Sequence, residues 1–349
     1  MAKRIRVSDD DGSTWYTLPG SSGEFSSEMA QVDDTIFGQD YQSESPAIGM
    51  WQVTANAYMK GIAGYVVKVM SGGTPVSTTS EATTLVSGKT YQVTDVAKRN
   101  ISYAGAVVVN DDGSPVATSD ILSIDYLQGM VTFVASYTPA AAITLDYDYV
   151  PTAVIGKARS YQLTQQQAEI DNTDYATALA NDGWRTHEGG LKTVNIEIGN
   201  IWNAANDFVD ILANRAQVFI EVSPNNTLAG GTSEIAYKGF FKYQTQGQSG
   251  NVGALEEESL TLNLFVPNSE VLSSPFTWIF GSAANISQAV KICLTAFING
   301  TPIMVQYSPD GTNGKEGDCI VTEASLSGTF EGQNEFSFTF RGSGAPADI

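Results

Sequence analysis

The chain has 349 residues, enough for two to three domains with a core in each. Eighteen lysines and arginines against 38 aspartates and glutamates give a formal net charge of -20, which works against tight binding to nucleic-acid phosphates or anionic membranes. A hydrophobic fraction of 42% argues against disorder, and no apolar run approaches the roughly 18 residues of a membrane span.

The first long predicted strand is the segment "GMWQVTANA". In it the apolar residues Val53 and Ala55 alternate with the polar residues Gln52, Thr54 and Asn56. Successive side chains of a strand point to opposite faces of the sheet. We therefore expect the three polar residues to share one solvated face and their neighbours to face a core.

The next stretch, residues 64–156, shows no helical period. Its apolar runs "AVVVN", "MVTFVA" and "ITLDYDYV" are predicted strands, and turn residues such as Asp111, Gly113 and Pro139 lie between them. Insertions are tolerated where loops already reach solvent. We predict that this stretch forms a small β insertion domain on the outside of the structure that the rest of the chain builds.

A second pair of predicted strands follows and resembles the first. Aligned with residues near the N-terminus, Asp171 falls on Asp33 and Val194 falls on Val53. The second strand of this pair again alternates, with apolar residues between polar ones. The polar residues expected on its solvated face are Thr193, Asn195 and Glu197.

Two segments have helical spacing, "NAANDFVDILANR" and "NISQAVKICLTAFING". Asn203 and Asn285 are the predicted N-caps, and Gly300 is predicted to end the second helix. The two helices are related by an offset of 85 positions, since Phe208 falls on Cys293 and Leu212 on Phe297.

The same offset of 85 relates "QVFIEVSPNNTLAGGTSEIAYKGFFKYQTQGQ" to "PIMVQYSPDGTNGKEGDCIVTEASLSGTFEGQ" without a gap. Val218 falls on Ile303 and Phe241 on Leu326. The strands "EESLTLNLF" and "EFSFTFRG" pair after a further change of offset. A repeat of this length indicates one structural unit used twice. We predict a mainly β chain of duplicated sandwich- or barrel-like units, each with one helix. The expected domains are an outer unit (1–63 and 268–349), the β insertion (64–156) and an inner unit (157–267).

Residues that carry catalysis are scarce. His187 is the only histidine and is predicted to be a surface loop residue, while Cys293 and Cys319 are predicted to be core thiols of a protein that folds in a reducing compartment. "SPDGTNGKEGD" lacks the alternate carboxylates of a calcium loop, and no acidic pair has a context that indicates a glycosidase. We expect no enzyme activity, no metal and no cofactor.

The stretch 160–200 carries "IDNT", "DGWR" and "GLKTV", and the chain closes with "FEGQNEFSFTFRGSGAP". In these motifs it resembles the major tail proteins of long-tailed bacteriophages, which form the tail tube. The likeness covers the inner unit well and the outer unit moderately, since the outer unit has "QSESPAIGMW" in place of the "DGWR" loop. A double unit with an insertion is similar to the duplicated tube proteins of some non-contractile siphophages. The resemblance implies an inter-subunit loop built from Asp182, Gly183, Trp184, Arg185 and His187.

The resemblance further implies a virion protein that is made in the host cytoplasm and polymerises with itself into stacked rings. A ring of three chains, each supplying two units, would be pseudo-hexameric. The implied partners are the tape measure, tail terminator and tail tip proteins, with double-stranded DNA passing through without specific binding. The polar residues of the two strands, among them Thr54 and Asn195, would then line an acidic lumen that repels phosphates.

One alternative from another class stays open. A β-rich adhesin or tail-fibre module could bind carbohydrate by stacking sugars on Trp51, Trp184 or Trp278. Tryptophan side chains more commonly pack in a core or an interface than stack on sugars.

Overall fold

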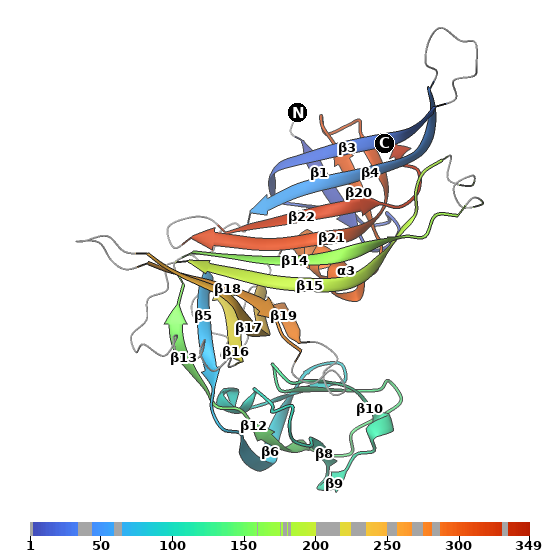
Figure 1. The fold of residues 1–349 in the computed structure, drawn as a ribbon. Helices are drawn as coiled ribbons and strands as arrows, with labels where there is room; N and C mark the ends of the chain where they lie inside the picture. The colour runs from blue at the N-terminus through green and yellow to red at the C-terminus, as the bar shows by residue number, and fades with distance from the viewer. Residues whose placement is uncertain are drawn as a thin grey trace. The chain divides into compact units, whose positions relative to one another are not determined.

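The protein is mainly β, as the sequence predicts, and its paired strands are antiparallel (Figure 1). A computed structural model defines its fold. The residues that the structure describes are 3–33, 44–58, 65–158, 160–174, 176, 180, 183–199, 217–224, 235–249, 257–266, 275–280, 287–329 and 334–349.

The chain divides into two compact units, and each draws on segments that are far apart in the sequence. Unit 1 consists of Met1–Gly64, Gln162–Asn195 and Ala284–Ile349, and unit 2 of Tyr65–Tyr161 and Ile196–Ala283. These boundaries differ from those of the three domains expected from the sequence, and the division into three domains stays a prediction.

Unit 1 is built on seven strands in the hydrogen-bonded order β3-β4-β22-β21-β20-β1-β2. Their bounds are β1 (Arg4–Ser8), β2 (Tyr16–Thr17), β3 (Gly20–Asp33), β4 (Glu44–Tyr58), β20 (Ile303–Ser308), β21 (Lys315–Thr329) and β22 (Glu335–Gly342). The short β23 (Ala347–Asp348) also pairs with β21. Figure 1 shows β14 (Ser160–Asp171) beside β21, with which it pairs, and β15 (His187–Gly199) beside β14.

The helix α3 (Gln288–Asn299) packs against β21 and β1 and buries most of its apolar side chains, including Cys293 and Phe297. Ser287 caps its N-terminus by accepting a hydrogen bond from the backbone N–H of Val290 (3.4 Å). The prediction of Asn285 as this N-cap is therefore wrong by two residues. Gly300 ends the helix as predicted, at φ 66°, a conformation that costs glycine nothing.

The earlier helical segment and its predicted cap, Asn203, lie outside the described residues. Both cysteines are buried and free, which agrees with their prediction as core thiols.

Unit 2 contains the strand order β13-β5-β16-β17-β18, followed by β15, whose last residues belong to this unit. The strands are β5 (Tyr65–Gly72), β13 (Thr152–Lys157), β16 (Val218–Pro224), β17 (Ile235–Ser249) and β18 (Glu257–Leu264), with β19 (Phe276–Phe280) paired to the first half of β17.

A seven-stranded sheet of order β10-β11-β7-β6-β12-β8-β9 completes unit 2. It comprises β6 (Val76–Ser87), β7 (Thr90–Val93), β8 (Val108–Asp111), β9 (Ser114–Pro115), β10 (Ile121–Asp125), β11 (Met130–Phe133) and β12 (Ile143–Tyr149), with short 3₁₀ turns at Val96–Lys98 and Thr118–Asp120. The predicted turn at Asp111 is a two-residue hairpin, since Asp112 and Gly113 both have positive φ (51° and 74°).

The seven-stranded sheet shares one core with the strands that flank it. Its buried residues Leu127, Phe133 and Leu145 belong to the same apolar cluster as Phe219 of β16 and Phe240 of β17. From the sequence we assigned β5 and β13 to the insertion; in the structure β5 pairs with β16 on one side and with β13 on the other. The segment 76–149 is thus the part of the chain that forms the separate sheet.

Lys238 of β17 is buried inside unit 2 and joins the two sheets. Its ammonium group donates to the backbone oxygen of Leu127 (2.9 Å) and to the side-chain oxygen of Asn100. Glu221, its cross-strand neighbour on β16, forms an ion pair with Lys68 of β5 (3.0 Å). Burial lowers the pKa of Lys238 to about 8, although the negative charge of Glu221 acts in the opposite direction.

The strands of the repeated segment, together with the strand that follows it, have the same pairing pattern in the two units. Val218 of β16 lies opposite Phe241 of β17, which lies opposite Leu264 of β18. In unit 1, Ile303 lies opposite Cys319, which lies opposite Gly342. The residue differences are 303 − 218 = 85, 319 − 241 = 78 and 342 − 264 = 78.

The second strand is therefore offset by 78 positions and not by the 85 expected from the ungapped alignment. The structural counterpart of Phe241 is Cys319, not Leu326. The reason is the connection between the first two strands: Val222 pairs with Tyr237, 15 positions on, whereas Tyr307 pairs with Lys315, only eight positions on. A β-bulge interrupts the next pairing of each unit at the same place, after Tyr243 in β17–β18 and after Val321 in β21–β22 (321 − 243 = 78).

Candidate functional site

A polar face extends across β3, β4, β22 and β21 of unit 1. Gln52, Thr54 and Asn56 of β4 are all partly exposed, and the residues between them are buried. Thr54 lies opposite Glu24 on one side and Thr339 on the other. The further members are Ser22, Ser26, Ser325, Ser337 and Arg341, by the same cross-strand pairing.

The alternation that keeps this face polar also builds the core beneath it. Val53, Phe338 and Phe340 are fully buried, and the rings of Phe338 and Phe340 stack at a centroid distance of 6.1 Å. A one-residue slip of register would exchange the two sets of side chains. The Asn56 side-chain amide donates to Ser22 Oγ (3.1 Å), which links β4 to β3 on the polar side.

The corresponding residues of β15 follow the same pattern. Thr193 and Glu197 are exposed and Asn195 is half-buried, while Val194 and Ile196 are buried. The alternation predicted from the sequence is present in both strands. Whether either polar face lines a lumen stays a prediction.

The loop before β15 is held against the beginning of β4 and the end of β22. The N–H of Gly49 donates to the carbonyl of Gly183 (2.7 Å), and the N–H of Arg185 donates to the carbonyl of Gly49 (2.9 Å). The ring of Trp184 covers Gly49 so closely that a Cβ there would lie 3.1 Å from the ring. We call residues 183–187 the junction loop.

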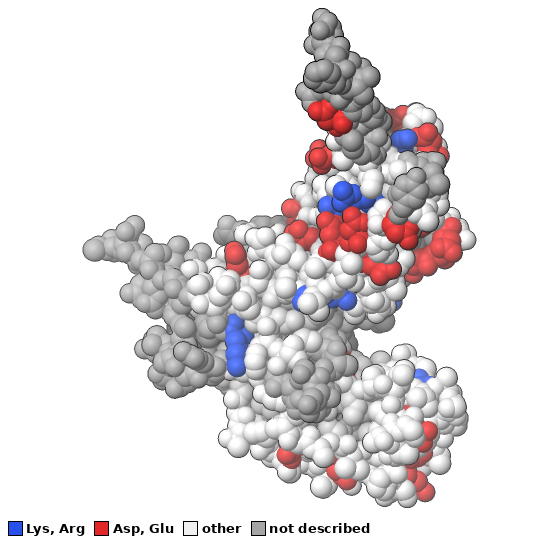
Figure 2. Space-filling model, turned by 45° about the vertical axis from the view of Figure 1, so that its right-hand side comes forward, with Lys and Arg blue, Asp and Glu red and all other residues white. Residues whose placement is uncertain are grey.

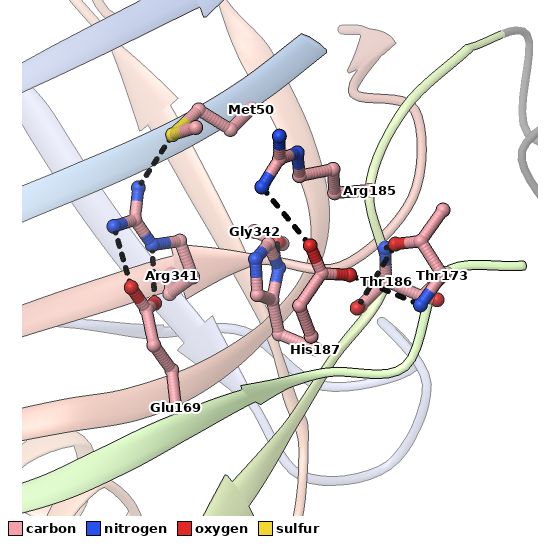
Figure 3. A network of polar contacts seen from close by, with 9 residues as sticks. Met50, Glu169, Thr173, Arg185, Thr186, His187, Arg341 and Gly342 are labelled. Atoms are coloured by element: carbon pink, nitrogen blue, oxygen red, sulfur yellow. Dashed lines mark hydrogen bonds and ion pairs between the residues drawn. The ribbon is translucent and has the colours of Figure 1, made fainter. Parts of the chain in front are cut away.

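A second set of contacts attaches the junction loop to the end of β22 and to the two residues after it. Figure 3 shows His187 beside Gly342, the last residue of β22. The N–H of Gly344 donates to the carbonyl of Arg185 (2.9 Å), and the N–H of His187 donates to Ser343 Oγ (3.2 Å). The His187 ring lies 3.1 Å from the carbonyl of Gly342 through Nδ1, so this nitrogen carries the proton.

His187 is thus a buried residue with 7% of its surface exposed, and its prediction as a surface loop residue is wrong. It begins β15, where the ring fills space beside Gly342 and gains a backbone acceptor. Gly183, Trp184 and Arg185 are half-buried in the same contacts, while Asp182 lies outside the described residues.

Two ion pairs flank the junction loop, both visible in part in Figure 3. Arg341 of β22 binds Glu169 of β14 through two hydrogen bonds, Nε to Oε2 (2.6 Å) and Nη2 to Oε1 (2.9 Å). Its remaining nitrogen contacts the sulfur of Met50 (3.5 Å). Hydrogen bonding to Arg341 holds the pKa of Glu169 below its usual range.

The second pair joins Arg185 to Asp171 (3.0 Å). Hydrogen bonds from Thr173, together with the charge of Arg185, hold the pKa of Asp171 below its usual range. Thr173 Oγ1 also accepts from the N–H of Thr186 (2.8 Å), which joins the residues that follow β14 to the junction loop.

The tryptophans differ in their surroundings. Trp51 (2% exposed) and Trp278 (6% exposed) are core residues, and Trp51 donates from its indole nitrogen to the carbonyl of Gly344 (2.8 Å). Trp184 is half-buried against Gly49. Neither Trp51 nor Trp278 presents a ring on which a sugar would stack.

Acidic side chains predominate over lysines and arginines among the described residues on the face that Figure 2 shows, in agreement with the net charge of -20. Within the described part of the chain, no helix has both the length and the apolar character that a membrane crossing needs. The sequence matches no protein-family model, and no curated protein is significantly similar to it.

Proposed function

We propose that the chain is a structural virion protein that polymerises as stacked rings into the tail tube of a long, non-contractile phage tail. The observation that carries the proposal is a strand order that occurs twice. The order β2-β1-β20-β21-β22-β4-β3 corresponds strand for strand to β13-β5-β16-β17-β18-β15-β14. Two strand sets with the same order in one chain are what a pseudo-hexameric ring of three chains requires.

The correspondence extends to where the strands end. At the offset of 138 positions predicted for the front strands, the last residue of β3, Asp33, falls on the last residue of β14, Asp171. At the offset of 141 predicted for the next strands, Tyr58 at the end of β4 falls on Gly199 at the end of β15.

The polar faces support a lumen for DNA. Serine, threonine, asparagine and glutamine side chains alternate with buried apolar ones, and the few charges on the β3–β4–β22 face include Glu24 and the Arg341 guanidinium that Glu169 neutralises. A wall without free cationic clusters does not retain phosphates.

Electron microscopy of the concentrated protein tests the proposal. We expect tubes of uniform bore whose reconstruction has three-fold symmetry with approximate six-fold symmetry. Monodisperse monomers at all concentrations, together with binding to a glycan array, would instead favour the adhesin. Six chains per ring would overturn the trimer and leave the tube.

A further inference from the structure

The two corresponding strand sets differ in one respect, which is the neighbour of the last strand. β14 pairs with β15 on one edge and with β21 on the other. Its counterpart β3 pairs with β4, and no described strand pairs with its second edge. The edge of β3 that no described strand covers is a template for another chain.

The strand that would receive β3 is identified by the position of β14. Cys319 of β21 pairs with β20 on one side and with β22 on the other, and the β22 pairing continues to Ser327. β14 therefore lies on the β20 side of β21, beyond Cys319, and Figure 1 shows it next to β21 opposite β22. The counterpart of this edge is β17 beyond Phe241, on the β16 side, which no described strand occupies.

The side chains of β14 and β3 also differ in solvent exposure. Gln165 and Gln167 of β14 are buried (0% and 6% exposed), and Gln167 lies near Gly300 at the end of α3. Their counterparts on β3, 138 positions earlier, are Ser27 and Met29, which are exposed, Met29 with 44% of its surface. The positions that are covered on β14 are therefore open to solvent on β3.

We propose that β3 of one chain pairs with residues 242–249 of β17 in a second copy of the same chain. This inference rests on the proposed function and names the surfaces that would join the chains of a ring. The joint between chains repeats the geometry of the β14–β21 joint within each chain. It is heterologous, because the edge of one strand set meets a different edge of the other, and such contacts close into a ring when the rotation between successive chains closes.

The chemistry of the two joints differs at one pair of positions. The ion pair Glu169–Arg341 lies at the joint within the chain. The counterpart of Glu169 is Gln31 (169 − 138), and that of Arg341 is Asn263 (341 − 78), and both are exposed. The joint between chains therefore has two neutral amides where the joint within the chain has a charge pair.

Hydrogen–deuterium exchange of dispersed and assembled protein tests the pairing directly. We expect the backbone amides of β3 and of residues 242–249 to become protected on assembly, while those of β14 and β21 stay unchanged. Tubes without new protection at both edges would overturn this inference and leave the proposed function intact. Failure to assemble at any concentration would overturn both.

Substitutions supply a second measurement. Met29→Glu would place an unpaired charge in the joint, and we expect it to raise the concentration needed for assembly by at least about tenfold. Leu122→Glu, at a residue 66% exposed on the seven-stranded sheet, is the matched control. The double variant Gln31→Glu with Asn263→Arg restores the charge pair and should lower that concentration about two- to fivefold at low salt. Equal effects of Met29→Glu and Leu122→Glu would contradict the assignment.

Discussion

Arg341 and Glu169 are 172 positions apart in the sequence, yet their side chains form a two-bond ion pair that joins β22 to β14 across β21. The guanidinium also contacts Met50, so one side chain connects three strands. Planar pairs of this kind fix geometry as well as charge.

The pH dependence of stability should report this pair. The pKa of folded Glu169 is lowered from 4.5, so its contribution is present above that value and is lost as the pH falls through the folded-state pKa. Because Glu169 is more than a third exposed, solvent screening limits the contribution to less than about 1 kcal/mol. Urea denaturation between pH 7 and pH 3 should show a shallower loss in Glu169→Gln than in the wild type. Identical slopes would show that the pair adds nothing.

Lys238 should also make stability rise with increasing pH, but in the alkaline range. Its pKa falls from 10.5 to about 8 on folding, so the unfolded chain binds the extra proton and stability rises as the pH increases from 8 towards 10.5. The rise amounts to about 3 kcal/mol at most. Lys238→Met should remove it, as measured by denaturation at pH 7, 9 and 10. Lys242→Met, at a half-buried lysine of the same strand, is the control and should keep the wild-type profile.

Gly342 is predicted to be intolerant of any side chain. A Cβ at this position would lie 2.1 Å from the ring of Trp51, which is buried and held by its hydrogen bond to Gly344. We expect Gly342→Ala to lower the free energy of unfolding by about 1–3 kcal/mol. Trp51→Phe removes part of the ring, so the double variant should lose less than the sum of the two single changes. Simple additivity in this cycle would show that the two residues do not interact.

The lumen prediction can be tested by labelling. Thr54→Cys introduces a thiol on the polar face, whereas the native Cys293 and Cys319 are buried. In assembled tubes we expect a bulky polyethylene-glycol maleimide to label Thr54→Cys at least about tenfold more slowly than in dispersed protein, because a narrow bore restricts the diffusion of a large reagent along it. Leu122→Cys should keep its rate. Rapid labelling of Thr54→Cys in intact tubes would place this face outside.

Sequence patterns predicted the elements better than their partners. The alternation around Val53 and Val194 indicated strands with one buried face, and Gly300 was recognised as a helix end because the signals for both are local. The 78-position offset between β17 and β21 was missed because it depends on the pairing Val222–Tyr237. An ungapped alignment of the sequence carries no information on which residues pair. The burial of His187 depends on residues 342 and 343, more than 150 positions away, and no local signal marks such a contact.

The pairing of β4 with β22 also determines when the sheet of unit 1 can form during translation. Val53 meets Phe340, and 340 − 53 = 287 residues separate them. At about 5–20 residues per second, a ribosome needs roughly 15–60 seconds to add the second strand after the first. During that interval β4 and β3 form at most a two-stranded hairpin, which is marginally stable by itself. The β3–β4–β22 sheet of unit 1 can therefore form only after β22 has been synthesised, and a shorter nascent chain has no finished sheet with which to join a neighbour prematurely.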